Sequence, residues 1–223
     1  MRFNPVPEKE IPWEYFTTEQ SKEVAKRLEE TLLRGDIPDF TPPYMGFDGS
    51  SLRYVCTAFR MWAYINQEFC QNLARAMESE FGPNATYLEI MAGMGWLAKG
   101  LIGADLKGIY IATDFKPPND AVFPVSKIDA IEAVKKHRDD VDAFVVSWPP
   151  YESPVIDLCL FEIPKGKKII YIGEGSGGCC GTDNFFSMVE SAKVRNPEIW
   201  EMAEDSLFRW GGINDYLSLF KIA

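Results

Sequence analysis

Apolar residues in the first third of the chain recur at the spacing of α-helices. Between residues 18 and 33, apolar positions return every three to four residues among charged ones. Thr18 stands where a helix begins, and Gly35 follows the last turn, as glycine often does at a helix end. A second helical pattern, rich in aromatic residues and methionine, runs from about residue 51 to residue 81. We therefore expect residues 1–82 to form a helical N-terminal extension, or lid.

From residue 86 onward, short apolar runs alternate with amphipathic segments. The apolar runs predict strands at residues 86–93, 106–114, 124–129, 141–148 and 167–174. The other segments predict helices at residues 95–102, 130–137 and 182–193. Strands that alternate with helices indicate βαβ units, a parallel sheet and helices on both of its faces. Two further runs, joined through a glycine pair, predict a closing antiparallel pair of strands at residues 206–210 and 215–222. The pattern thus predicts one compact α/β domain over residues 83–223.

A glycine turn joins the first predicted strand to the helix that follows it. Gly93 and Gly95 stand in this turn, where glycine lets the backbone approach a ligand and the helix N-terminus offers unpaired N–H groups. Asp114 ends the next strand, where a carboxylate can accept both hydroxyl groups of a ribose. Together these features predict an adenosine-containing ligand at the carboxyl ends of the strands.

Two classes of adenosine ligand are compatible with the glycine turn. Gly93, Gly95 and Ala98 satisfy the G-x-G-x-x-G/A pattern of dinucleotide-binding proteins. Glu89 and Asp129 favour S-adenosylmethionine instead. The stretch E-x-x-x-G-x-G from Glu89 resembles the first motif of class I methyltransferases, whose acidic residue lies near the methionine end of the cofactor. That family often places a second acidic residue, here Asp129, after the third strand to accept from the adenine amino group.

The fourth strand ends in an unusual proline pair. Ser147 and Trp148 precede Pro149 and Pro150, and Tyr151 follows them. Two prolines fix the backbone and remove two N–H donors, so that the preceding carbonyl groups are free to face a ligand. The stretch resembles the [D/N/S]-P-P-[Y/F/W] loop of methyltransferases that act on amino groups in planar systems. Trp148 stands where that loop has its polar residue, and Ser147 lies one position earlier. The departure leaves open a degenerate fold that binds the cofactor or a partner without turnover.

The last third adds further motifs. The fifth strand leads into Y-I-G-E-G-S-G-G-C, which contains Glu174, and W-G-G-I-N-D precedes the last strand. With the proline motif and Trp62-Ala63-Tyr64-Ile65, they resemble a poorly characterised methyltransferase-like group, over residues from about 50 to the end. The resemblance implies a Rossmann-like class I methyltransferase sandwich, whose seven-stranded sheet is mostly parallel with an antiparallel last strand. It also implies methyl transfer from S-adenosylmethionine.

The resemblance assigns roles to named positions. The implied cofactor-binding residues are Glu89, Ala92, Gly93, Gly95, Trp96, Asp114, Phe115, Asp129, Ala130 and Ser147. The implied catalytic residues are Ser147, Pro149 and Tyr151. The implied substrate-binding residues are Trp62, Tyr64, Trp148, Tyr151 and Glu174.

Composition and net charge restrict the classes of ligand that the chain is expected to bind. The chain has 223 residues, 46% of them hydrophobic and 25% charged, which is the balance of an ordinary globular protein. Its net charge of −10 argues against a large phosphate-binding surface, without excluding a local site for nucleic acid. A small molecule or a peptide side chain is therefore the expected methyl acceptor. No run approaches the roughly 20 apolar residues that cross a bilayer, and the N-terminus lacks the apolar core of a secretory signal.

The cysteines and the single histidine argue against a disulfide-stabilised fold, a zinc site and mechanisms that use two histidines. Five cysteines at irregular spacing, without a C-x-x-C pair, offer neither a disulfide framework nor a zinc ligand set. One histidine excludes mechanisms that need two. We therefore expect the protein to be in a reducing compartment, the cytoplasm. The sequence leaves the oligomeric state open, and a dinucleotide-dependent oxidoreductase remains the alternative enzyme class.

Overall fold

Seven strands form a single sheet in the computed structural model, which describes residues 5–43 and 47–222. The spatial order is β3-β2-β1-β4-β5-β7-β6. The bounds are β1 Thr86–Ile90, β2 Ile109–Asp114, β3 Ser126–Lys127, β4 Ala143–Ser147, β5 Lys168–Gly173, β6 Val189–Ser191 and β7 Tyr216–Ile222. Pairing from β3 through β5 is parallel, while β7 runs antiparallel to both β5 and β6. The predicted Rossmann-like sandwich with an antiparallel last strand is confirmed.

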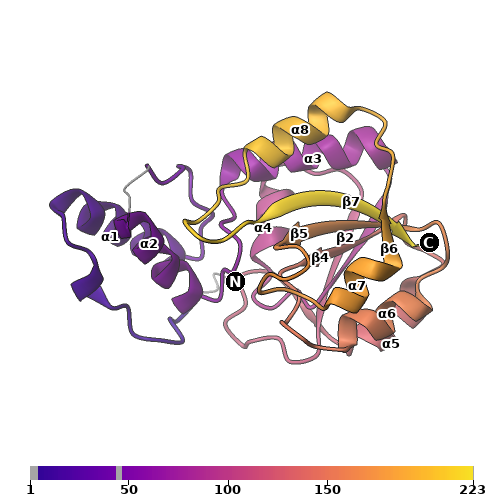
Figure 1. Ribbon diagram of the computed structural model, residues 1–223, viewed down its shortest axis with the longest axis horizontal. Helices are drawn as coiled ribbons and strands as arrows, with labels where there is room; N and C mark the ends of the chain where they lie inside the picture. Colours follow the sequence, from indigo (N-terminus) through magenta and orange to yellow (C-terminus); the bar gives the residue numbers. More distant parts are fainter. Residues whose placement is uncertain (1–4, 44–46, 223) are drawn as a thin grey trace.

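Helices cover both faces of the sheet (Figure 1). One face carries α3 (Gln67–Phe81), α4 (Trp96–Gly103) and α8 (Pro197–Asp205), and the other carries α5 (Ala130–His137), α6 (Val155–Glu162) and α7 (Asp183–Met188). Alternate residues of β4 therefore enter two separate cores: Val145 packs in the first and Val146 in the second. Burial on both faces explains why the central strands read as continuous apolar runs.

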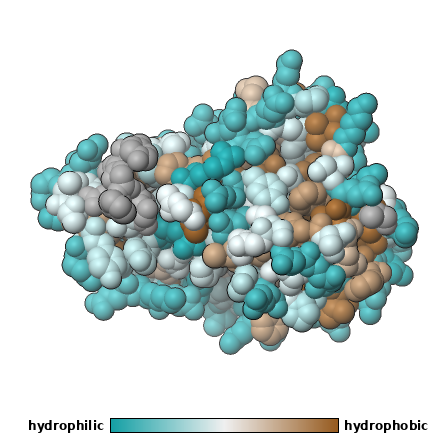
Figure 2. Space-filling view, viewed as in Figure 1, coloured by the Kyte–Doolittle hydropathy of each residue, from teal (hydrophilic) through white to brown (hydrophobic). Residues whose placement is uncertain are grey.

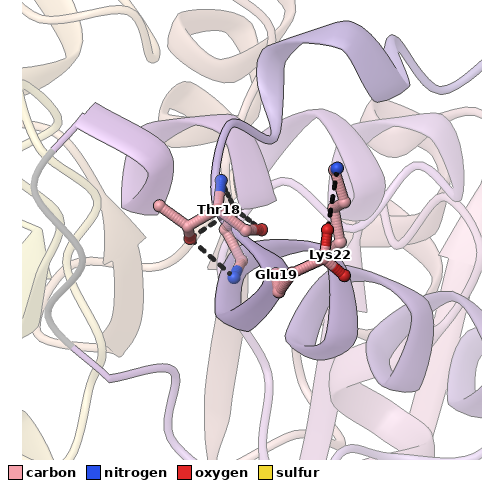
Figure 3. Close-up of polar contacts among 4 residues, drawn as sticks. Thr18, Glu19 and Lys22 are labelled. Atoms are coloured by element: carbon pink, nitrogen blue, oxygen red, sulfur yellow. Dashed lines mark hydrogen bonds and ion pairs between the residues drawn. The ribbon is translucent and has the colours of Figure 1, made fainter.

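The N-terminal helices α1 (Glu19–Leu33) and α2 (Phe47–Ala58) extend beyond the sheet in Figure 1. The short 3₁₀ helix η1 (Trp13–Tyr15) precedes them. Thr18 caps α1, because its Oγ1 accepts from the Ser21 N–H at 3.1 Å and the Ser21 Oγ accepts from the Thr18 N–H at 3.2 Å. Glu19 and Lys22 add an ion pair in the first turn, as Figure 3 shows. The predicted start of this helix is confirmed.

The single helix predicted from residue 51 to residue 81 is wrong. The chain forms α2 and α3 with a non-helical segment between them, at residues 59–66, that includes a turn and a bend. Arg60 adopts a left-handed φ of 57°, and the Asn66 side chain caps α3 by accepting from the Phe69 N–H at 2.8 Å. Phe59 and Tyr64 in this segment are buried by tertiary contacts, so the run of apolar residues mimics the pattern of a continuous helix.

Two further element predictions are wrong. The helix predicted over residues 182–193 ends at Met188, and the chain continues as strand β6, which pairs with β7. The strand predicted over residues 206–210 is absent; only Phe208 makes an isolated bridge, to Tyr64. The apolar residues of that run are buried in the core beside α8 rather than paired in the sheet. β5 and β6 are therefore the antiparallel neighbours of β7.

Figure 2 shows a hydrophilic face that is interrupted by separate apolar patches. Across residues 5–43 and 47–222, no helix combines the length and the apolar character needed to cross a membrane.

Candidate functional site

A cavity of about 560 Å³ opens at the carboxyl ends of β1, β2 and β4. This volume lies within the range of ligand pockets. Eleven of the residues expected at a functional site line it: Trp62, Glu89, Ala92, Gly93, Trp96, Asp114, Phe115, Asp129, Ala130, Ser147 and Trp148. Parallel strands bring these distant positions together, because their carboxyl ends meet at one edge of the sheet.

The two glycines of the turn after β1 have different surroundings. Gly93 has a φ of +54°, and no atom lies within 4 Å of the position that a Cβ would take. Its backbone therefore borders open space in the cavity. Gly95 also has a positive φ, of +75°, but a Cβ there would lie 2.8 Å from the Cβ of Phe123. Gly95 is not among the cavity-lining residues, and it lets the following chain pack against the turn.

Asp114 ties the end of β2 to the glycine turn. One carboxylate oxygen accepts from the Gly93 N–H at 2.9 Å, and the other accepts from the Lys116 N–H at 2.8 Å. Each carboxylate oxygen has a second lone pair, so Asp114 keeps the capacity to accept from a ligand. The carboxylate is thus fixed in place and lines the cavity.

Glu89 is a buried carboxyl group on β1, only 2% exposed. The Tyr110 hydroxyl donates to it at 3.1 Å. Burial raises its pKa to about 8, the negative charge of Asp114 adds to the rise, and the Tyr110 hydrogen bond opposes it. The cavity therefore contains a carboxyl group that is mostly protonated at neutral pH and that a nearby cation would ionise.

Asp129, Ala130 and Phe115 occupy the adjoining wall. Asp129 is the N-cap of α5 and accepts from the Ile131 N–H at 2.9 Å. Phe115 is 68% exposed although it lines the cavity. An acid fixed by a helix terminus and an exposed ring are suited to bind a flat polar heterocycle.

The end of β4 places an indole beside the cavity. Trp148 has a φ of 49°, and its N–H donates to the Ile172 carbonyl at 2.8 Å. Its Nε1–H donates to Asp215 Oδ1 at 2.9 Å. The ring of Trp62 stacks on it, with centroids 6.2 Å apart and planes 18° apart. Burial raises the pKa of Asp215 to about 7, and the Trp148 hydrogen bond opposes that rise.

Four other expected residues lie away from the cavity wall. Tyr64 is fully buried and donates its hydroxyl hydrogen to the Phe40 carbonyl at 2.9 Å. Glu174 accepts from the Cys179 and Asn214 N–H groups, which lowers its pKa despite burial. The remaining two, Pro149 and Tyr151, lie beyond the wall: the carbonyl of Pro149 accepts from the Gly181 N–H, and Tyr151 is 60% exposed and borders a second, smaller cavity.

The N-terminal extension supplies wall residues that the sequence reading missed. Glu8, Arg60 and Met61 line the cavity. Arg60 donates to both carboxylate oxygens of Asp120, at 3.0 and 2.9 Å. These positions belong to no recognisable motif, and only the folded chain brings them to the ends of the strands.

Comparison with known proteins gives a match in fold. No protein-family model matches the chain, and no curated protein does. Two solved structures of MtNAS, a mutant in complex with S-adenosylmethionine and a complex with MTA and tNA, each align with a TM-score of 0.50 and 12% identity. They cover 92% of this chain and 72% and 70% of theirs. A SAM dependent methyltransferase from Archaeoglobus fulgidus aligns at a TM-score of 0.41 and 14% identity, over 70% of this chain and 94% of its own. The chain has the Rossmann-like fold of the class I methyltransferase sandwich.

Proposed function

We propose that this chain transfers a methyl group from S-adenosylmethionine to a small molecule or to an amino or amide group. The observation that carries the proposal is the convergence of Glu89, Gly93, Asp114 and Asp129 on one cavity at the carboxyl edge of the sheet. The shared fold with MtNAS, one structure of which holds S-adenosylmethionine, supports it. We further propose a cytoplasmic setting, which the five free thiols support.

The residues present match the groups of S-adenosylmethionine. Gly93 borders open space that a side chain would otherwise fill, so the methionine end of the cofactor can approach the backbone there. Glu89 would lie near the positive charge at that end, Asp114 would accept from the ribose hydroxyls, and Asp129 would accept from the adenine amino group. Phe115 would pack on the adenine ring.

Bound S-adenosylmethionine supplies a methyl group already activated by a positive sulfur: the acceptor's lone pair forms the bond to the methyl carbon, and the broken bond's electrons stay on sulfur. The chain's own task is therefore to align the acceptor and exclude water. Ser147, Trp148 and Pro150, at the end of β4, line the part of the cavity where an acceptor would lie. Trp62, from the segment before α3, lies opposite Trp148.

Two alternatives give different results in a binding experiment. A degenerate methyltransferase fold would bind S-adenosylhomocysteine without turning over S-adenosylmethionine. A dinucleotide-dependent oxidoreductase would bind NAD instead. The sequence favours neither over methyl transfer, because the acids that flank the glycine turn match the ends of S-adenosylmethionine.

The test is calorimetric titration of the full chain with S-adenosylhomocysteine and, in parallel, with NAD. We expect micromolar binding of S-adenosylhomocysteine that is lost in Asp114→Ala and kept in Asp139→Ala, which removes an exposed acid outside the cavity. Preference for NAD, or no binding of either compound, would reject the proposal. The chain is then incubated with S-adenosylmethionine and a panel of acceptors, and the by-product identifies which bond of the cofactor breaks. Methyl transfer leaves S-adenosylhomocysteine, whereas transfer of the aminocarboxypropyl arm leaves methylthioadenosine.

A further inference from the structure

Trp62 is an exposed indole on a rigid, buried segment. Its neighbours Met61, Ala63 and Tyr64 are 1%, 3% and 0% exposed, whereas Trp62 itself is 44% exposed. Hydrogen bonds anchor residues on both sides of Trp62: the Phe59 carbonyl accepts from the Trp96 indole N–H at 2.9 Å, and the Tyr64 hydroxyl donates to the Phe40 carbonyl at 2.9 Å. The indole is therefore fixed in position, with a large apolar area exposed at the cavity.

Trp148 has no free hydrogen-bond donor in its side chain, and the guanidinium of Arg53 lies over its ring, with Cζ 5.1 Å from the ring centroid. Its indole N–H is already used by Asp215. Its plane lies within 18° of that of Trp62, so the two indoles form a stacked pair, here called the Trp62–Trp148 platform. Both members line the cavity. A side chain with no free donor or acceptor selects its ligand by the shape and the π-surface of that ligand.

The charges on the cavity wall oppose an anionic acceptor. The described wall residues include the carboxyl groups of Glu8, Glu89, Asp114 and Asp129 but no lysine or histidine. Arg60 is the only basic residue among them, and both carboxylate oxygens of Asp120 already bind its guanidinium group. The wall itself therefore offers a carboxylate or phosphate on the acceptor no free cation. The guanidinium of Arg53, which lies over the Trp148 ring with its Cζ 5.1 Å from the ring centroid, is not one of the wall residues.

We propose that the acceptor is a flat aromatic ring without negative charge, and that it stacks on the exposed indole of Trp62 in the Trp62–Trp148 platform. This inference rests on the proposed function, because it assigns the acceptor end of the same cavity. It narrows the acceptor to heteroaromatic or aryl compounds and excludes aliphatic amines and anionic rings. Exposed aromatic surface that is held rigidly binds such rings at a low entropic cost.

The test uses the full chain saturated with S-adenosylhomocysteine and titrated with quinoline, which is flat and neutral, and with quinoline-4-carboxylate, which is anionic. Affinities are measured by ligand-observed NMR. We expect quinoline to bind at least tenfold more tightly than its carboxylate. Trp62→Ala should weaken quinoline binding about two- to tenfold, the range expected from an aromatic pair. Trp62→Phe should retain part of the affinity.

Trp13→Ala is the matched control, because Trp13 is similarly exposed, at 40%, but lies outside the cavity wall. It should leave quinoline binding unchanged. S-adenosylhomocysteine affinity, measured in every variant, shows whether the fold and the cofactor end are intact. Normal S-adenosylhomocysteine binding together with a Trp62→Ala affinity equal to wild type, or with equal binding of the carboxylate, would overturn this inference alone. Failure of the wild-type chain to bind S-adenosylhomocysteine would overturn the proposed function and this inference with it.

Discussion

Replacing Glu89 by glutamine should remove most of the pH dependence of cofactor binding. In the free chain burial raises the Glu89 pKa to about 8, so about 90% of molecules carry it protonated at pH 7. The sulfonium and ammonium groups of S-adenosylmethionine would favour the ionised form, since a nearby opposite charge lowers the pKa of a carboxyl group. Binding therefore releases a proton, and affinity rises with pH until the free carboxyl group is ionised.

The size of the effect follows from the fraction of ionised Glu89 in the free chain. About 1% is ionised at pH 6 and about half at pH 8, so wild-type affinity should rise roughly 50-fold over this interval. Tyr110 and Asp114 are the ionisable neighbours that contribute to this pKa, and neither is changed by the substitution. Glu89→Gln should bind with a nearly flat profile, as weakly at pH 8 as wild type binds near pH 6.

Calorimetry in two buffers of different ionisation enthalpy measures the protons released. We expect close to one proton per bound S-adenosylmethionine at pH 7 in wild type and none attributable to residue 89 in Glu89→Gln. Groups on the ligand titrate equally in both proteins, so the difference isolates the carboxyl group. Glu132→Gln, an exposed acid on α5 outside the cavity, is the control and should match wild type. Equal proton release by Glu89→Gln and wild type would refute the reasoning.

Three other substitutions probe the surrounding structure. Gly95→Ala should lower the free energy of unfolding by about 1–3 kcal/mol in urea denaturation, because the new methyl group would lie 2.8 Å from the Phe123 Cβ at a positive φ; an unchanged midpoint would contradict this. Thr18→Ala should cost about 1 kcal/mol through loss of the α1 cap (Figure 3), again measured by urea denaturation. Asp215 has a folded-state pKa of about 7, above the usual value of 3.8, so its contribution to stability is greatest below pH 4 and is lost as pH rises through 7. Asp215→Asn retains an acceptor for the Trp148 indole, and its stability should lose this dependence, by as much as about 4 kcal/mol between pH 4 and pH 8 in parallel denaturation curves.

The parallel core of the fold was predictable because its signals are local. The strands β4 and β5 are buried on both faces and read as nearly continuous apolar runs, and β1 does so apart from Glu89. Helix α5 matches its predicted bounds because Asp129 caps it and three basic residues end it. The helix α6 and the split between α2 and α3 were missed, because burial by tertiary contacts imposes an apolar pattern that no local period explains.

The expected cofactor residues reach one cavity for the same reason. Glu89, Gly93, Asp114 and Asp129 each lie at or next to a strand end, so strand order alone brings them together. The residues expected to bind the acceptor do not all lie in the cavity. Trp62 lines the cavity while Tyr64, two positions later, is buried in the core. A bend at Ala63 separates them, and no local sequence pattern indicates which of the two side chains faces the site.

The two halves of the cavity therefore depend on different parts of the chain. Strand ends supply the wall where an adenosine group would bind, and this wall is fixed within the sheet by short-range contacts such as the one from the Gly93 N–H to Asp114. The opposite wall needs the N-terminal extension, which is joined to the loop after β2 by the ion pair between Arg60 and Asp120. At the end of β4, Trp148 gives this part of the cavity a ring whose N–H is bound to Asp215. If the proposed function holds, such a site would separate cofactor binding, set by the sheet, from acceptor choice, set by the extension and one indole. Changes at Trp62 should consequently alter which acceptor binds and leave the affinity for S-adenosylhomocysteine unchanged.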